Sequence, residues 1–371
     1  MTYKQEKNAE TLDKCQEMLD SLPGFCSGYA VSISGFNKPL TQLAYLQRIS
    51  VFCKWLYEYS VYFAKKPIPN FTIDDMALLK KADIEEFLHH LDTYGAASKE
   101  EIKTARQTKT VLPGVSDATR NSYISALNSL YNYFLDNEYI EKNPMARIKH
   151  RTLGKKEVVA LDDYQKDQLL QVIDYGSSKM TKKQLEDREK LSLRDHTIIL
   201  LALRTGLRVS EIVGLDIDNI DFRKNTLKVH RKRDKDDTVY MDDEVKAYLL
   251  EWLEERKIFH PADDERAVFV SGKGQKSGTR LSVRSIQLLV KKYSEFAIPE
   301  IASEMHPHRL RSTFCSDLID ETHDIYYAKS VMAHENIQTT TLYIRESQHQ
   351  KEANRNILLK KEANSNKKEP V

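Results

Sequence analysis

Residues 197–211 read TIILLALRTGLRVSE, and this stretch decides how the second half of the chain folds. Its first seven residues are almost entirely apolar, which indicates a strongly hydrophobic helix. Gly206 stands where that helix should end, because glycine readily adopts the left-handed conformation that closes many helices. The stretch therefore predicts a helix that ends at a glycine, with Arg208 directly behind it.

Residues 215–241, which follow this stretch, alternate in short apolar runs. Such runs predict a small antiparallel sheet, with the basic residues 231–235 at a hairpin turn. Apolar residues at helical spacing resume afterwards. They predict helices over residues 244–255, 283–296, 311–318, 325–332 and 337–343.

The first half of the chain is helical by the same criteria. Residues 8–22 are expected to form a polar helix that ends at Pro23-Gly24, and apolar spacing predicts a helix over residues 41–62. Asp83 and Glu86 form the pattern of a capping box, and Asp117 is expected to cap a further helix. The polar residues 95–116 between these two helices are expected to form a loop.

Length and composition agree with a mainly α protein of more than one domain. The chain has 371 residues with only 12 Gly and 10 Pro, so the commonest turn and strand signals are scarce. We expect a helical domain, a basic linker, a domain of helices with a small antiparallel sheet, and a polar tail. The boundaries are residues 1–146, 147–159, 160–345 and 346–371.

Several classes of protein are disfavoured. The four cysteines are scattered without a C-x-x-C pair, which argues against disulfide scaffolds and thiolate metal sites. Paired histidines and clustered carboxylates at metal-binding spacing are also lacking, so no metal is expected. The first residues lack an apolar signal segment, and no window is apolar enough to span a membrane. A cytoplasmic protein without membrane contact is expected.

The net charge of +2 hides an uneven distribution. Residues 223–235 hold seven Lys or Arg against one Asp, and residues 147–156 hold five Lys or Arg and no acid. Charge runs are often solvated helix faces, but separated basic and acidic regions also suit a protein that binds a polyanion.

An ordered set of polar residues runs through the second half. Arg208 lies in a T-G-L-R-V-S-E motif, and Lys232 lies on the predicted hairpin. His308 and Arg311 are three residues apart at a helix start, which places them on one face. His334 and, nine residues later, Tyr343 complete the set. This pattern resembles the tyrosine recombinases of the phage-integrase and Xer-like family, over about residues 160–344 and more weakly over the helical domain.

The resemblance implies a metal-independent and ATP-independent DNA strand transfer. Arg208 and Arg311 would stabilise the charge on the scissile phosphate, and Tyr343 would be the nucleophile. The resemblance implies that Lys232 is the general acid, although Lys228 and Lys235 lie nearby. The resemblance also implies that His308 is a general base or proton shuttle and that His334 donates a hydrogen bond to the phosphate. Glu211 would be a carboxylate that orients the site.

The sequence departs from the family pattern near the catalytic set. Ala333 replaces the usual glycine before the histidine, Ser312 follows Arg311, and Arg231 and Arg233 flank Lys232 where glycines are common. The helical domain resembles the core-binding domain of the family. Residues suited to DNA contact are Arg120, Asn121, Asn128, Arg147, Lys149, Arg151, Arg231 and Arg233.

The leading hypothesis is a site-specific recombinase that cuts and rejoins duplex DNA. By resemblance, it would act as a homotetramer on paired DNA and exchange strands through a Holliday junction. The polar tail, residues 346–371, is expected to dock on a neighbouring copy, because Ile357, Leu358 and Leu359 would otherwise form an exposed apolar run. A type IB topoisomerase and a non-catalytic DNA-binding relative are the alternatives. We expect a nucleoid-associated protein of a prokaryotic or mobile-element host. Its role in the host would be either the resolution of chromosome dimers or the mobility of a genetic element.

Overall fold

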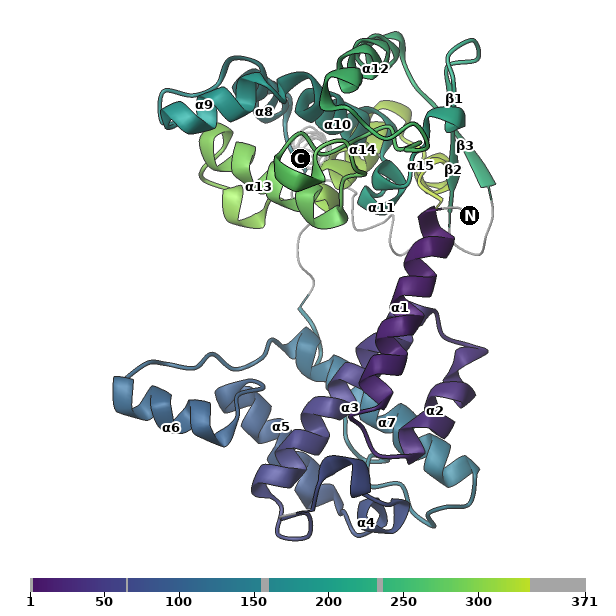
Figure 1. Cartoon of the computed structure of the whole chain (residues 1–371), viewed down its shortest axis with the longest axis vertical. Coiled ribbons are helices and arrows are strands. Elements are labelled where there is room, and N and C mark those ends of the chain that lie inside the picture. The colour runs from purple at the N-terminus through teal and green to yellow at the C-terminus, as the bar shows by residue number, and fades with distance from the viewer. Residues whose placement is uncertain (1–2, 65, 155–159, 232–235, 334–371) are drawn as a thin grey trace, which may run out of the picture. The chain divides into compact units, whose positions relative to one another are not determined.

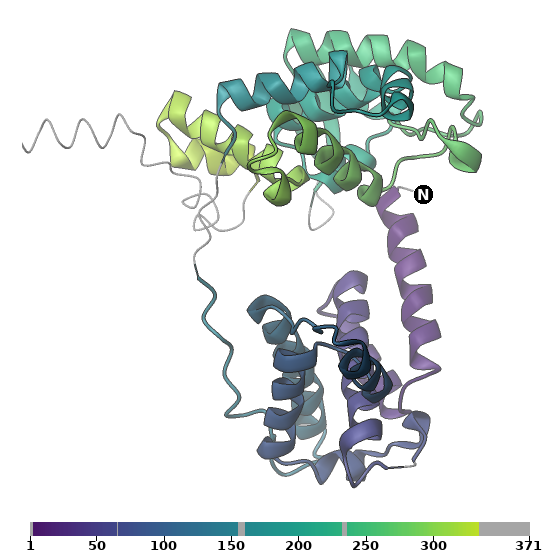
Figure 2. The same ribbon diagram turned by 90° about the vertical axis from the view of Figure 1, so that its left-hand side faces the viewer.

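The computed structural model describes residues 3–64, 66–154, 160–231 and 236–333. The chain divides into two compact units, Met1–Lys155 and Lys156–Val371. Figures 1 and 2 show the helices of each unit in two views. The expected fold class is confirmed, because the described residues are mainly helical and carry a small antiparallel sheet in the second unit.

The first unit is a helical bundle built around a long helix, α3, that contacts α1, α2 and α7 (Figure 1). Aromatic rings fill its core. The ring centroids of Phe52 and Phe87 lie 4.9 Å apart, and those of Phe87 and Tyr123 lie 5.7 Å apart. Each buried ring contributes about 2 kcal/mol of hydrophobic stabilisation. The helices are α1 (Tyr3–Leu19), α2 (Phe25–Ser34), α3 (Pro39–Tyr59), α4 (Ile73–Ala77), α5 (Lys81–Tyr94), α6 (Lys99–Thr108) and α7 (Asp117–Asp136).

Helix α6 overturns one prediction, because residues 95–116 were expected to form a loop. The helix starts with a capping box in which Ser98 Oγ accepts from the backbone N–H of Glu101, at 3.2 Å, and Glu101 Oε2 accepts from that of Ser98, at 2.7 Å. Only Ile102 and Ala105 of this helix are buried. With so few apolar residues, the helical period is weak in the sequence.

Two predicted helix caps are also wrong. Asp83 does not begin a capping box with Glu86; it is the third residue of α5, and its carboxylate accepts from the backbone N–H of Lys80 at 2.7 Å. At α7 the capping hydroxyl belongs to Ser116, which accepts from the backbone N–H of Thr119 at 3.3 Å. In each case the cap lies ahead of the residue that the sequence pattern selected.

Helix α10 (Ser192–Thr205) forms the core of the second unit, as its apolar sequence predicted. Residues 197–203 are all buried, and the helix contacts α8, α12 and α14 on different sides. A helix surrounded in this way needs apolar residues over its whole circumference. The other helices are α8 (Asp163–Tyr175), α9 (Lys182–Glu189), α11 (Val209–Val213), α12 (Asp243–Glu255), α13 (Val283–Ala297), α14 (Pro307–Thr322) and α15 (Ile325–Val331).

The predicted sheet is present. Its strands are β1 (Ile220–Asp221), β2 (Thr226–His230) and β3 (Asp236–Tyr240), antiparallel and in the order β1-β2-β3. Residues 232–235 of the expected hairpin turn lie outside the described residues, as does the expected helix over 337–343.

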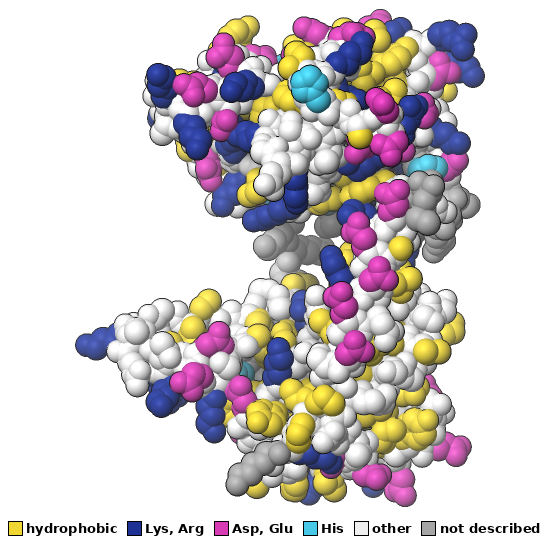
Figure 3. Space-filling view, viewed as in Figure 1, with side chains coloured by type: hydrophobic (Ala, Val, Ile, Leu, Met, Phe, Trp, Pro, Cys, Tyr) yellow, Lys and Arg dark blue, Asp and Glu magenta, His cyan; other side chains and the backbone are white. Residues whose placement is uncertain are grey.

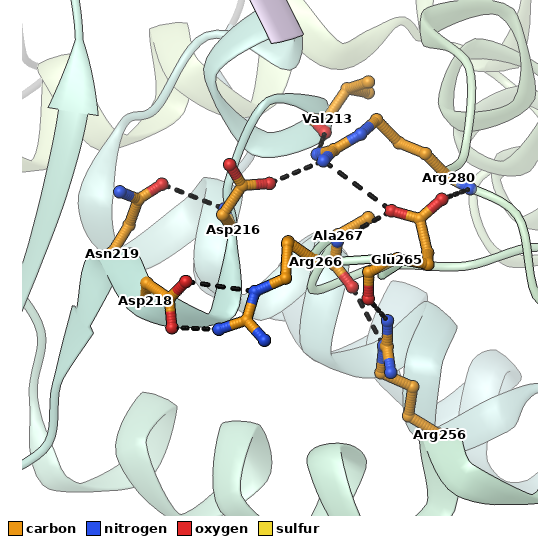
Figure 4. Close-up of polar contacts among 9 residues, drawn as sticks. All are labelled: Val213, Asp216, Asp218, Asn219, Arg256, Glu265, Arg266, Ala267 and Arg280. Carbon is orange, nitrogen blue, oxygen red and sulfur yellow. Dashed lines mark hydrogen bonds and ion pairs between the residues drawn. The ribbon is translucent and has the colours of Figure 1, made fainter. Parts of the chain in front are cut away.

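A polar network fixes the chain between α11 and the sheet (Figure 4). Arg280 Nη1 donates to Val213 O at 2.9 Å, and its Nη2 donates to Asp216 Oδ1 at 2.5 Å. Arg256 Nε donates to Ala267 O at 2.9 Å, which holds the adjoining segment to the end of α12. The network therefore supports the segment that leads directly away from Arg208 and α11.

Charges of both signs are visible on the surface of the second unit, between hydrophobic and uncharged areas (Figure 3). Figure 3 shows Lys and Arg side chains interspersed with Asp and Glu on this face. The separation of basic and acidic regions that the sequence suggested is therefore not evident on the face shown.

Candidate active site

Arg208 is held by a carboxylate one turn away. It occupies the N-cap position of α11, where its backbone N–H donates to Glu211 Oε2 and its Nη1 donates to Oε1, both at 2.8 Å. The Glu211 side chain is 5% exposed, whereas that of Arg208 is 27% exposed. The carboxylate thus orients a guanidinium whose outer part reaches solvent.

Gly206 brings the two arginines of the predicted site together. It ends α10 with a left-handed φ of 61°, as the sequence predicted. A Cβ atom here would lie 2.4 Å from Phe314 Cδ1, so the position has no room for a side chain. Its carbonyl accepts a hydrogen bond from Arg311 Nη1. The turn that places Arg208 therefore also anchors Arg311.

Arg311 lies in the first turns of α14, which begins at Pro307. The residue is 1% exposed. Besides its bond to Gly206 O, its Nη2 donates to Met332 O at 2.5 Å. A buried guanidinium needs such acceptors, because burial without them is costly. Arg311 consequently joins the ends of α10 and α15.

His308 lies one turn before Arg311 and is exposed. Although part of the residue reaches solvent, partial burial of its ring lowers the pKa of His308, and the positive charges of Arg311, His306 and Arg208 lower it further. Its imidazole is therefore held in the neutral form near pH 7. A neutral imidazole can accept a proton, which the expected role of general base or shuttle requires.

The end of α15 collects three guanidinium groups. Arg231 Nη1 donates to Val331 O at 3.2 Å, Arg311 Nη2 to Met332 O at 2.5 Å, and Arg208 Nη2 lies 3.5 Å from Ala333 O. The last carbonyls of a helix carry partial negative charge and need external donors. Three arginines from distant parts of the sequence thus meet at the residues that directly precede His334.

Ala333 adopts the left-handed conformation, with φ at 46°. The family usually has glycine here, and a side chain in this region costs about 1–2 kcal/mol. We expect Ala333→Gly to raise the free energy of unfolding by about 0.5 kcal/mol, because relief of strain exceeds the added flexibility of the unfolded chain. Chemical denaturation measures the change. Ala328→Gly, in the middle of α15, is the control and should destabilise; destabilisation by both would contradict the account.

Four of the expected site residues lie outside the described residues: Lys232, Arg233, His334 and Tyr343. Lys235, one of the two neighbouring lysines, lies outside them too. The other, Lys228, forms an ion pair with Asp236 at 2.8 Å.

Several residues expected to contact DNA are engaged within the first unit. Asn121 Nδ2 donates to Arg151 O, and Arg151 N donates to Asn121 Oδ1, both at 2.8 Å. The Arg151 guanidinium bonds Asp117 at 2.8 Å and Asp92 at 2.5 Å. Arg120 lies 3.4 Å from the same Asp92 carboxylate. The first residues of the expected linker are thus attached to α5 and α7, which the basic composition of this segment did not reveal.

The other candidates differ in exposure. Arg147 and Lys149 are exposed, and Asn128 is partly buried. Arg231, which was also expected to contact DNA, is 7% exposed. Its contacts with Asp237, six residues away, and with Val331, a hundred residues away, could not be predicted, because strand alternation carries no signal for them.

Within the described part of the chain, no helix combines the length and apolar character needed to cross a membrane.

Comparisons with known proteins agree with the arrangement of the second unit. Residues 160–350 match the phage integrase family. Tyrosine recombinase XerS of Streptococcus uberis is 29% identical over 350 residues, which cover 90% of this chain and 94% of that protein. Tyrosine recombinase XerC of Alcanivorax borkumensis is 28% identical over 230 residues, covering 62% and 69%.

Solved structures of recombinases share the fold. The XerH site-specific recombinase in its post-cleavage complex with palindromic difH has a TM-score of 0.62 at 19% identity, covering 94% of this chain and 88% of that chain. The Tn1549 transposon integrase in complex with circular intermediate DNA has a TM-score of 0.56 at 21% identity, covering 88% and 98%. The chain therefore belongs to the phage integrase family and is a tyrosine recombinase of the Xer type, as the residue pattern predicted.

Proposed function

We propose that this protein recombines duplex DNA at a specific site through a 3′-phosphotyrosyl intermediate. The observation that carries the proposal is the convergence of Arg208 and Arg311 beside His308. Each guanidinium is oriented by the protein itself, through Glu211 in one case and through two backbone carbonyls in the other. Fixed guanidinium groups stabilise the negative charge that develops on a phosphate under attack.

Each remaining residue has a role in the same step. The Tyr343 oxygen attacks the scissile phosphorus and displaces the 5′ oxygen, which takes a proton from Lys232. His308 serves as base or proton shuttle, and His334 donates a hydrogen bond to the phosphate. Rejoining reverses the step with a 5′ hydroxyl from the partner strand. The phosphotyrosine retains the bond energy, so rejoining needs no nucleotide.

We assign the two units different parts of this reaction. Residues 1–146 would bind DNA as the core-binding domain, and residues 147–159 would link this domain to the catalytic domain. Residues 160–345 would form the catalytic domain, which binds and cleaves the DNA. Recombination joins two duplexes, so we propose four copies on paired sites, with residues 346–371 docking on a neighbouring copy and strands exchanged through a Holliday junction. Such a protein would act in the nucleoid of a prokaryotic or mobile-element host.

A plasmid assay tests recombination against simple relaxation. Sites are recovered by selecting bound fragments of the source genome, and two copies are placed in one supercoiled plasmid. We expect deletion products from direct repeats, inversion products from inverted repeats, and neither from a plasmid without the sites. Relaxation of all three plasmids without recombinants would instead identify a topoisomerase-like activity and refute the proposal.

The lowered pKa of His308 predicts the pH dependence of cleavage. A depressed pKa keeps the imidazole neutral to lower pH than an ordinary histidine with a pKa of about 6.5. We therefore expect kcat/KM for cleavage to hold as the pH falls through 6.5 and to drop only below it. A pH profile of cleavage measures this dependence, and the His308→Gln variant should lack the fall in kcat/KM at acidic pH. A fall in the wild-type kcat/KM that begins above pH 6.5 would contradict the role given to His308.

A further inference from the structure

Arg231 is a buried charge at the end of β2. It follows β2 directly and is 7% exposed. Its Nε lies 2.9 Å from Asp237 Oδ2, and its Nη1 donates to Val331 O at 3.2 Å. Asp237 lies on β3 opposite Val229 of β2. One guanidinium therefore connects the base of the β2–β3 hairpin with the end of α15, a hundred residues further along the chain.

This connection differs from the other polar contacts at the base of the hairpin. Asp236 also accepts from His230 and pairs with Lys228, but all three of these residues lie on β2 and β3. Those contacts join strand to strand. The contact of Arg231 with Val331 joins the hairpin to the end of α15, where Arg311 and Arg208 approach the next two carbonyls, those of Met332 and Ala333.

The rigid geometry of an arginine fork suits such a connection. A guanidinium presents several donors in a fixed plane, so it can hold a carboxylate on one side and a carbonyl on another. Burial of the guanidinium reduces the competition of water for its contact with Val331 O, whereas the Asp237 carboxylate is 44% exposed. Arg231 thereby fixes where the end of β2 lies relative to residues 331–333.

We propose that Arg231 is a positioning residue for the proton transfer to the leaving 5′ oxygen. It is covalently joined to Lys232, and it ties the chain directly ahead of this lysine, at the end of β2, to residue 331 beside the arginine site. The inference rests on the proposed function, in which Lys232 is the general acid. The arginine, which stands where the family commonly has glycine, supplies a fixed point that glycine does not provide.

A change of leaving group tests this role. Suicide DNA substrates are prepared with the ordinary bridging 5′ oxygen or with sulfur at that position. A thiolate leaves without prior protonation, so cleavage of the sulfur substrate does not need a general acid. The rate of covalent adduct formation is measured on both substrates at saturating protein.

We expect Arg231→Ala to slow adduct formation on the oxygen substrate by about tenfold or more, because a general acid typically accelerates such a step by about a hundredfold or more. On the sulfur substrate, the variant should form the adduct at close to the wild-type rate. Asp237→Asn, a milder change of the same contact, should give a smaller effect in the same direction. Arg223→Ala is the matched control, because Arg223 is an exposed arginine just after β1. It should match wild type on both substrates.

The outcomes separate the inference from the proposed function. Equal losses on both substrates would show that Arg231 and Asp237 support the fold of the site and not the proton transfer, which overturns the inference. Wild-type rates for both variants on the oxygen substrate would overturn it as well. Failure of the wild-type protein to form an adduct on either substrate would contradict the proposed function itself.

Discussion

Replacing Tyr343 by phenylalanine is expected to abolish the covalent adduct between protein and DNA. The substitution removes one oxygen atom, the proposed nucleophile, and leaves the ring. Binding of the DNA should persist, because affinity for DNA arises mainly from contacts with the phosphate backbone over the whole site. A suicide substrate nicked near the cleavage site traps the wild-type adduct, which denaturing gel electrophoresis separates from free protein.

The chain offers matched controls for this result. Tyr326 and Tyr327 are exposed tyrosines of α15, close to Tyr343 in sequence. Phenylalanine at either position should leave adduct formation unchanged. Equal trapping by wild type and Tyr343→Phe would refute the assignment of the nucleophile.

Replacing Arg311 by alanine should have the second large effect, and it should act on both activity and stability. Loss of one fixed donor to a charged transition state costs about a hundredfold to a thousandfold in rate. The same change leaves Gly206 O and Met332 O without this donor and opens a cavity. We expect the free energy of unfolding to fall by about 2–4 kcal/mol. Cleavage rates and chemical denaturation measure the two effects separately.

Two other arginines make the comparison specific. Arg208→Ala should abolish cleavage with a smaller loss of stability, because Arg208 is more exposed and bonds mainly to Glu211. Arg204→Ala should leave cleavage unchanged, since Arg204 is an exposed residue paired with Glu244 at 2.9 Å. A cleavage rate for Arg311→Ala within a few-fold of wild type would contradict the role given to this guanidinium.

Features with a strong local pattern could be predicted from the sequence. The apolar run before Gly206 gave a helix that is buried on every side, and the glycine ends it in the left-handed conformation. Strand alternation also located the small sheet. These predictions succeed because backbone conformation and burial there depend on neighbouring residues.

Features that depend on distant contacts could not be predicted. Helix α6 was missed because a capping box and two buried residues stabilise it, without a long apolar stripe. Arg231 and Arg151 were assigned to DNA because both lie in basic stretches, yet their guanidinium groups contact carboxylates of the protein. A charge run in the sequence does not show which of its members is buried.

The arginine site shows the same limit in a functional setting. The sequence pattern placed Arg208, His308 and Arg311 in one site, and the structure brings Arg208 and Arg311 to adjoining carbonyls at the end of α15. The pattern did not reveal that one of these carbonyls holds Arg311 in position, nor that the next one lies beside Arg208. That arrangement is a consequence of tertiary packing between α10, α14 and α15.

Identification of the residue that carries the DNA tests the central claim most directly. Wild-type protein is trapped on a suicide substrate, the adduct is digested with protease and nuclease, and the modified peptide is sequenced by mass spectrometry. The account predicts a 3′-linked nucleotide on the Tyr343 oxygen and on no other residue. A nucleotide on a different side chain, or cleavage without any protein adduct, would contradict it.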